Sequence, residues 1–223
     1  MEGKTRKLFL ATALTWALFQ VWIASPLPYI LPIDWLLFNG NQTRSIHLAF
    51  ALFLAYLSFP RSMRAPRGHV PLLDWGLAII AAFCAAYFYL DYEAISDRVG
   101  APILRDIIVA CIGVPLLLEG ARRSLGPVLA IIATLFLLYS FFGHLMPEMI
   151  AHKGYSLAEV VNHQWITTEG VFGVSLGVSA DFVFLFVLFG ALLDKAGAGN
   201  YFIKLAFSLL GHYRGGPAKA AVV

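Results

Sequence analysis

Six long runs of apolar residues, separated by polar segments, are the dominant pattern of this chain. A helix needs about 20 mainly apolar residues to cross the hydrocarbon of a bilayer. Four of the runs approach or reach that length, whereas the second and the fourth are shorter and must extend into their flanks or lie as re-entrant pieces. The runs are Leu8–Ala24, Ile46–Phe59, Leu72–Leu90, Ile107–Leu118, Val128–Gly143 and Val171–Leu193.

The apolar residues are continuous within each run and do not alternate with polar ones. In lipid every backbone amide must be hydrogen-bonded inside the structure, so only helices and closed barrels can span a membrane, and barrel strands alternate with period two. The pattern therefore predicts an all-α fold, a polytopic membrane protein with about six transmembrane helices. The segment Tyr201–Leu210 is amphipathic, with Lys204 and Ser208 opposite a broad apolar side, and predicts an interfacial helix.

Charged residues between the runs predict the orientation, because short loops rich in Lys and Arg stay in the cytoplasm. Basic residues lie before the first run and in the second and fourth connections, at Lys4, Arg6, Lys7, Arg61, Arg64, Arg67, Arg122 and Arg123. Acidic residues predominate in the third and fifth connections, at Asp91, Glu93, Asp97, Asp106, Glu148, Glu159 and Glu169. An even number of spans with both ends in the cytoplasm satisfies these loops.

The composition excludes an ordinary water-soluble domain, since 60% of the residues are hydrophobic and 13% are charged, against about 25% charged in soluble proteins. The net charge of +3 is scattered over the predicted cytoplasmic loops, so nothing indicates a nucleic-acid partner. Cys84 and Cys111 both lie inside predicted spans. Two buried thiols are therefore favoured over a disulfide.

Two motifs invite a catalytic or metal-binding interpretation that their context does not support. Residues 173–177 have the spelling G-x-S-x-G of a nucleophile elbow, but this copy opens an apolar helix, where it favours close helix packing. The histidines His144, His152 and His163 share one external segment without the spacing of a zinc site, so solvated loop histidines are favoured and no metal is expected.

Asp181 lies in the last apolar run, after Ser175 and Ser179. A carboxylate at membrane depth usually faces a partner or a water-filled cavity. These three residues are thus candidates for substrate binding, in a polar pocket near the outer end of this helix. The alternative is that Asp181 lies close enough to the interface to be hydrated.

The stretch Gly173–Gly199, followed by Phe202 and by Gly211–Lys219, resembles the fused permeases of tripartite ATP-independent periplasmic (TRAP) transporters, most closely the TAXI-associated type. The resemblance is specific across 120–223 and looser before it. It implies a small four-span domain over residues 1–122 and the start of the large transport domain over residues 123–223, with the chain as the front of a longer protein. Members usually carry an uncharged residue where Asp181 stands, so the resemblance assigns that residue no role.

The resemblance further implies secondary active uptake across a bacterial or archaeal cytoplasmic membrane. A periplasmic TAXI-type solute-binding protein would deliver an organic anion, and an ion gradient, commonly sodium, would drive it inward. No cofactor is expected, and the coupling ion would bind downstream of this chain, in the remainder of the transport domain. This region would brace that domain and help dock the binding protein, through 91–106 and 144–169.

Two other classes of function stay open from the residues alone. A polytopic membrane enzyme needs convergent polar residues inside the spans, and apart from Asp181 and the serines none is recognised. A non-transporting membrane scaffold or assembly protein has the same composition as a permease.

Overall fold

The computed structural model describes residues 3–31, 36–61, 70–98 and 100–210. Helices, turns and loops account for all of these residues, which confirms the predicted all-α class. The long helices of the first part are α1 (Gly3–Ala24), α3 (Gly40–Ser58), α4 (Leu72–Leu90), α6 (Leu104–Leu125) and α7 (Pro127–Phe142). The shorter ones are α2 (Leu27–Ile30), α5 (Tyr92–Asp97), η2 (Gly143–Leu145), α8 (Leu157–Val161), η3 (Asn162–Ile166) and α9 (Val174–Val178), followed by η4 (Ser179–Val183), α10 (Phe184–Lys195) and α11 (Ala198–Leu210).

Four segments of the described chain are long and apolar enough to cross a membrane, and each coincides with a predicted run. They are Thr5–Ala24, Leu72–Leu90, Pro127–Leu145 and Val174–Lys195. The two short runs extend into their flanks, since α3 has 19 residues and α6 has 22, although neither helix is among these four segments. At 1.5 Å per residue, 19 residues make a helix of roughly 28 Å, close to the thickness of a bilayer core. The chain is therefore a multi-pass membrane protein.

Local sequence explains where several helices begin and end. Asn39 and Gln42 form a reciprocal capping box that starts α3, with the Asn39 side chain accepting from the Gln42 amide at 2.9 Å. Gly126 ends α6 at φ +92°, a conformation that other residues rarely adopt, and Pro127 opens α7 directly after it. This turn makes α6 and α7 neighbours.

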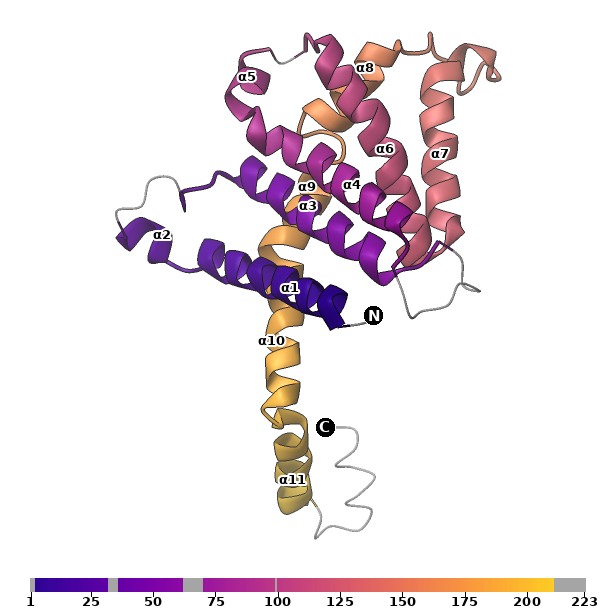
Figure 1. Cartoon of the computed structure of the whole chain (residues 1–223). Coiled ribbons are helices and arrows are strands. Elements are labelled where there is room, and N and C mark those ends of the chain that lie inside the picture. The colour runs from indigo at the N-terminus through magenta and orange to yellow at the C-terminus, as the bar shows by residue number, and fades with distance from the viewer. Residues whose placement is uncertain (1–2, 32–35, 62–69, 99, 211–223) are drawn as a thin grey trace. The chain divides into compact units, whose positions relative to one another are not determined.

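The chain divides into two compact units, Met1–Ala180 and Asp181–Val223. In the first unit α3, α4 and α6 lie side by side, with α1 packed against α3 and α7 against α6 (Figure 1). The predicted boundary after residue 122 falls near the end of α6, inside this unit. That boundary concerns correspondence with two transporter components and stays a prediction.

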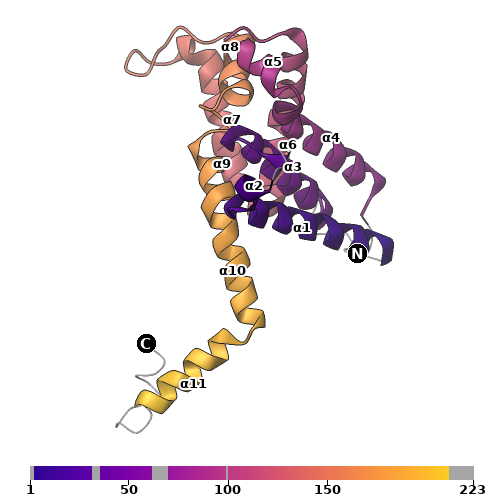
Figure 2. The same cartoon turned by 90° about the vertical axis from the view of Figure 1, so that its left-hand side faces the viewer.

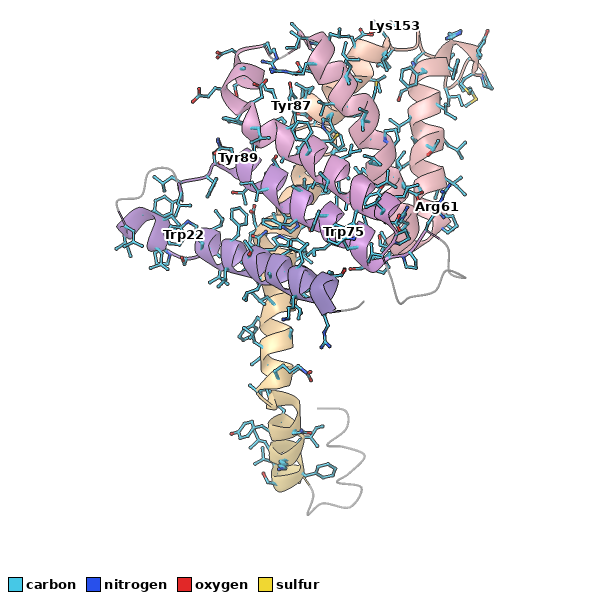
Figure 3. All side chains as sticks on the ribbon, viewed as in Figure 1. Trp22, Arg61, Trp75, Tyr87, Tyr89 and Lys153 are labelled. Atoms are coloured by element: carbon cyan, nitrogen blue, oxygen red, sulfur yellow. The ribbon has the colours of Figure 1, made fainter. Side chains whose placement is uncertain are left out.

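The charged connections are sorted between the two ends of the first unit. Figures 1 and 2 show α5 and α8, from the two acidic connections, at one end, while α3 meets α4 and α6 meets α7 at the other. In Figure 3 Tyr87 lies on the part of α4 nearest α5 and α8, and Trp75 lies toward the opposite end of the helix. This sorting agrees with the alternation of loop charges. We call the end with α5 and α8 the outer end and the opposite one the inner end, after the predicted orientation, which stays a prediction.

The core of the first unit includes side chains from the segment after α7. Trp165 and Phe172 have no exposed surface, and Ile166 is 2% exposed. Trp165 donates its indole N–H to the Cys84 carbonyl of α4 at 3.2 Å. Its ring lies over Gly113 of α6, where an added Cβ would stand 2.8 Å from Cε2. The segment predicted as one exposed external loop therefore folds back into the bundle over its second half.

Two sequence-based expectations need correction. Cys111 is exposed on α6, although Cys84 is buried as expected, because Cys111 does not share the face of α6 that packs on its neighbours. The last apolar run begins its helix at Val174, three residues later than predicted, because Val171 and Phe172 pack into the core before the helix starts. A helix, α11, is present over the segment predicted to be interfacial, and its exposed apolar residues include Tyr201, Phe202 and Leu205. Its position at the membrane interface stays a prediction.

Candidate functional site

Helix α3 carries polar side chains into the interior of the first unit. Thr43, Ser45 and His47 are all buried, and Arg44 is partly buried. Ser45 links α3 to α4, since its hydroxyl donates to the Ala85 carbonyl at 2.7 Å and accepts from the Tyr89 amide at 3.1 Å. Buried polar groups that are hydrogen-bonded in this way fix the helix register.

Three side chains form a continuous hydrogen-bonded chain through this interior, which we call the His47 chain. His47 Nδ1 lies 2.5 Å from Nε2 of Gln20 on α1, and His47 Nε2 lies 3.3 Å from Oγ of Ser179. Gln20 is 1% exposed and His47 4%. Because the amide nitrogen of Gln20 can only donate, Nδ1 accepts and the ring proton stands on Nε2, from which it is donated to Ser179.

Two aromatic rings, Trp16 on α1 and Phe50 on α3, pack beside the His47 chain. The Trp16 ring meets the His47 ring edge-on, with centroids 5.0 Å apart, and stacks on Phe50 at 6.2 Å. The imidazole is thus held between a polar partner at each nitrogen and an indole at its edge. Such packing restricts the ring to one orientation.

Arg44 lies one helical turn before His47 and reaches the same downstream segment. Its Nη1 donates to the Phe172 carbonyl at 3.1 Å. A Cβ at Gly177 would stand 2.7 Å from Arg44 Nε, so the absence of a side chain at Gly177 lets the guanidinium lie against α9. Arg44 and His47 together tie α3 to residues 172–179.

The three predicted site residues have different surroundings. Ser179 is partly buried and joins the His47 chain, whereas Ser175 and Asp181 are exposed. Asp181 belongs to the second unit. Their assignment to substrate binding stays a prediction.

Sequence reasoning missed His47 and Gln20, since it recognised no convergent polar residues in the spans besides Asp181 and the serines. That statement was wrong: His47 lies inside the second apolar run, Gln20 inside the first, and the fold brings them together. The signal was present in the sequence, because a His and a Gln within apolar runs are the residues that seek partners in lipid.

The outer end of the first unit is closed by an ionic cluster around Arg98. Its guanidinium donates to both oxygens of Asp106, at 3.0 and 2.9 Å, and to Asp91 at 2.5 Å. Arg105 also donates to Asp91, and Tyr87 to Asp106. The hydrogen bond from Arg98 holds the pKa of Asp91 below its usual value, and the bonds to Asp106 and Asp91 raise the pKa of Arg98.

A second ionic cluster closes the inner end. Arg123 on α6 donates to Asp74 on α4 and to Glu119, both at 2.8 Å. The side chains of Arg123 and Asp74 are only 1% and 5% exposed, so this is a buried ion pair. Arg122 binds Glu119 with two hydrogen bonds but is 40% exposed. Both ends of the bundle are thus locked by charge pairs between helices.

An exposed tip at the outer end follows α7 and is folded by its own side chains. Tyr139 donates to the Ile150 carbonyl at 2.6 Å. His152 accepts from the Gly154 amide at Nδ1, so its Nε2 carries the proton that it donates to the Tyr139 carbonyl at 3.1 Å. Met149 at the end of the tip is 98% exposed. His144, His152 and His163 belong to no cluster of metal-ligating residues within the described ranges.

The model of the family described as "Tripartite ATP-independent periplasmic transporter, DctM component" matches residues 112–223, half of the chain. The chain belongs to this family. No curated protein and no solved structure matches it. As a TRAP transporter component, the protein is a membrane permease, and the match includes Trp165, Arg44's partner Phe172 and Ser179. The described clusters are therefore contacts within the membrane part of a transporter.

Proposed function

We propose that the chain joins two TRAP components, with residues 1–122 as a small four-helix membrane component and residues 123–223 as the start of the large transport component. The first range holds α1, α3, α4 and most of α6, the four long helices that such a component needs. We assign the protein to the type that works with TAXI-type binding proteins. The sequence resemblance over residues 173–199 and 211–219 supports this assignment.

The transport reaction in this proposal is the import of an organic anion of the carboxylate class. A periplasmic solute-binding protein delivers the anion, and an inward ion gradient, sodium in the first instance, drives it across the bacterial or archaeal cytoplasmic membrane. Broken helices supply the ion site and the anion site of such transporters. In this proposal neither the ion nor the anion binds at the ionic clusters described above. The described region then serves as brace and docking platform.

The observation that carries the bracing role is the shared core of the two proposed parts. Trp165 and Phe172, which come from the family match, are fully buried against Cys84 and Phe88 of the preceding helices. Phe172 stacks on Phe88 with ring centroids 4.9 Å apart. Because the two proposed parts share this core, neither can slide against the other without losing several buried contacts. Such a fixed arrangement is what a rigid support requires.

The outer end is the docking platform in this proposal. The candidate docking segments are 91–106, which contains α5, and 144–169, which contains α8. Figure 1 shows α5 and α8 at that end. The tip exposes Leu145, Met149 and Ile150 beside Glu148 and Lys153. An apolar centre with charged neighbours is the usual make-up of a protein interface.

Uptake of labelled carboxylates into proteoliposomes tests the proposed function. The vesicles hold the permease that contains this chain, together with its binding protein, and carry an inward sodium gradient. We expect uptake that needs both the binding protein and the gradient. Uptake that persists without the binding protein contradicts the docking role, and a folded permease that moves no carboxylate under sodium or proton gradients contradicts transport itself.

A further inference from the structure

The polypeptide passes from the first compact unit to the second inside a widened helical turn. Residues Ser179–Val183 form η4, a π-helical turn between α9 and α10, and the division between the units falls between Ala180 and Asp181. A π-turn leaves the ordinary hydrogen-bond ladder of an α-helix, and such turns concentrate at functional positions. A helix bends most readily where its ladder is interrupted.

The His47 chain ends at the first residue of this turn. Ser179 begins η4 and receives the hydrogen bond from His47, which is itself held by Gln20. The three side chains come from α1, α3 and the π-turn, so the bond joins helices that are far apart in sequence. The residue next to Ser179, Ala180, is fully buried, and it is the last residue of the first unit.

A hydrogen bond to a serine hydroxyl in an apolar helix also has a local meaning. Ser140, in another described span, donates to the carbonyl of Phe136, four residues earlier in its own helix, at 3.0 Å. Ser179, like Ser45, has a partner on another helix. The hydroxyl of Ser179 therefore joins the turn to α3.

We propose that His47, backed by Gln20, is a positioning residue that anchors the π-turn at Ser179 and so holds the start of this widened turn against α3. This structural role of Ser179 replaces its predicted role in substrate binding. In lipid Ser179 finds no water to replace this partner, so the bond is retained. Arg44, through the Phe172 carbonyl, steadies the same segment at its start.

Hydrogen exchange of the purified full chain tests the anchor without any transport measurement. We expect Ser179→Ala to speed exchange of the amides in 178–184 by about fivefold, the factor that corresponds to one ordinary hydrogen bond. Ser179→Thr keeps the hydroxyl and should restore the wild-type exchange. Ser140→Ala, which removes a serine hydroxyl bonded within its own helix, is the matched control and should leave 178–184 unchanged.

Uptake kinetics supply the second readout, which rests on the proposed function. Loss of the anchor should lower the maximal rate and leave KM unchanged, because in this proposal the anchor positions the turn and does not touch the solute. Unchanged exchange in Ser179→Ala, or an equal effect of Ser140→Ala, overturns the anchor, and so does a raised KM with an unchanged maximal rate. A wild-type permease without uptake contradicts the proposed function alone, since the exchange measurement still decides the anchor.

Discussion

The guanidinium of Arg123 lies over the ring of Tyr56, with its carbon 4.7 Å from the ring centroid, and so joins the last turn of α6 to the end of α3. The same guanidinium donates to Asp74 and to Glu119. The inner end of the bundle therefore holds a buried positive charge that contacts one aromatic ring and two carboxylates. Three helices meet at this one side chain.

Removing the carboxylate should therefore destabilise the bundle strongly. Asp74→Ala leaves Arg123 buried with only the partly exposed Glu119 as counter-charge, and we expect a loss of about 3 kcal/mol in unfolding free energy. Thermal unfolding of the detergent-solubilised protein measures the change. Arg122→Gln is the control, because that exposed arginine should contribute under about 1 kcal/mol. Equal effects of the two substitutions contradict the buried ion pair.

The outer cluster predicts a dependence of stability on pH. The pKa of Asp91 is lowered in the folded protein, so its stabilising effect is present above its unfolded value of about 3.9 and is lost as the pH falls through the folded value. Asp91→Asn should cost about 1 kcal/mol at pH 7, and the difference from wild type should shrink below about pH 4. Melting temperatures of both proteins between pH 3 and pH 7 measure it.

Asp97→Asn is the control for this measurement. Asp97 is exposed on the same segment and has no ion pair among the residues that the structure describes. Its substitution should leave the unfolding free energy within about 0.5 kcal/mol of that of the wild type at each pH. A pH-independent difference between Asp91→Asn and wild type would mean that charge does not act there.

The contact between Gly113 and Trp165 predicts a size limit on α6. Gly113→Ala brings a methyl group into the Trp165 ring, 2.8 Å from Cε2 and closer still to Cζ2, and overpacking of this kind typically costs about 1–3 kcal/mol. Gly76→Ala on α4 meets no atom within 4 Å and should be neutral or stabilise the helix by up to about 1 kcal/mol. Thermal unfolding of the two variants distinguishes them, and a tolerated Gly113→Ala argues against the buried position of Trp165.

Accessibility labelling checks the proposed orientation. In a background of Cys84→Ala and Cys111→Ala, Met149→Cys should react with a membrane-impermeant maleimide added outside intact cells, because Met149 is 98% exposed on the outer tip. Arg61→Cys, at the inner end, should react only after permeabilisation. The reverse labelling pattern inverts the assignment of the two ends.

The helices were predictable from this sequence because lipid imposes long apolar runs on every span, and loop charge then separates the two ends. The short runs at α3 and α6 were underestimated for a physical reason. Their ends carry polar side chains such as Arg44 and Asp106 whose partners lie on other helices. Hydropathy read along one chain treats these side chains as the end of a span.

The His47 chain could be suspected only in part. A His and a Gln inside apolar runs indicate a search for partners, but which partners they find depends on helix rotation and depth. The insertion of Trp165 left no comparable signal, since a single tryptophan in a polar loop is as typical of a membrane interface as of a core.

The burial of Trp165 also sets an order of events during synthesis. The chain emerges from the ribosome with its N-terminus first, so α3, α4 and α6 enter the bilayer while the residue that fills the space beside Gly113 has yet to be translated. That face of α6 can be covered by the indole only when the later segment folds back. The front of this protein therefore completes its folding only after the downstream half has been made.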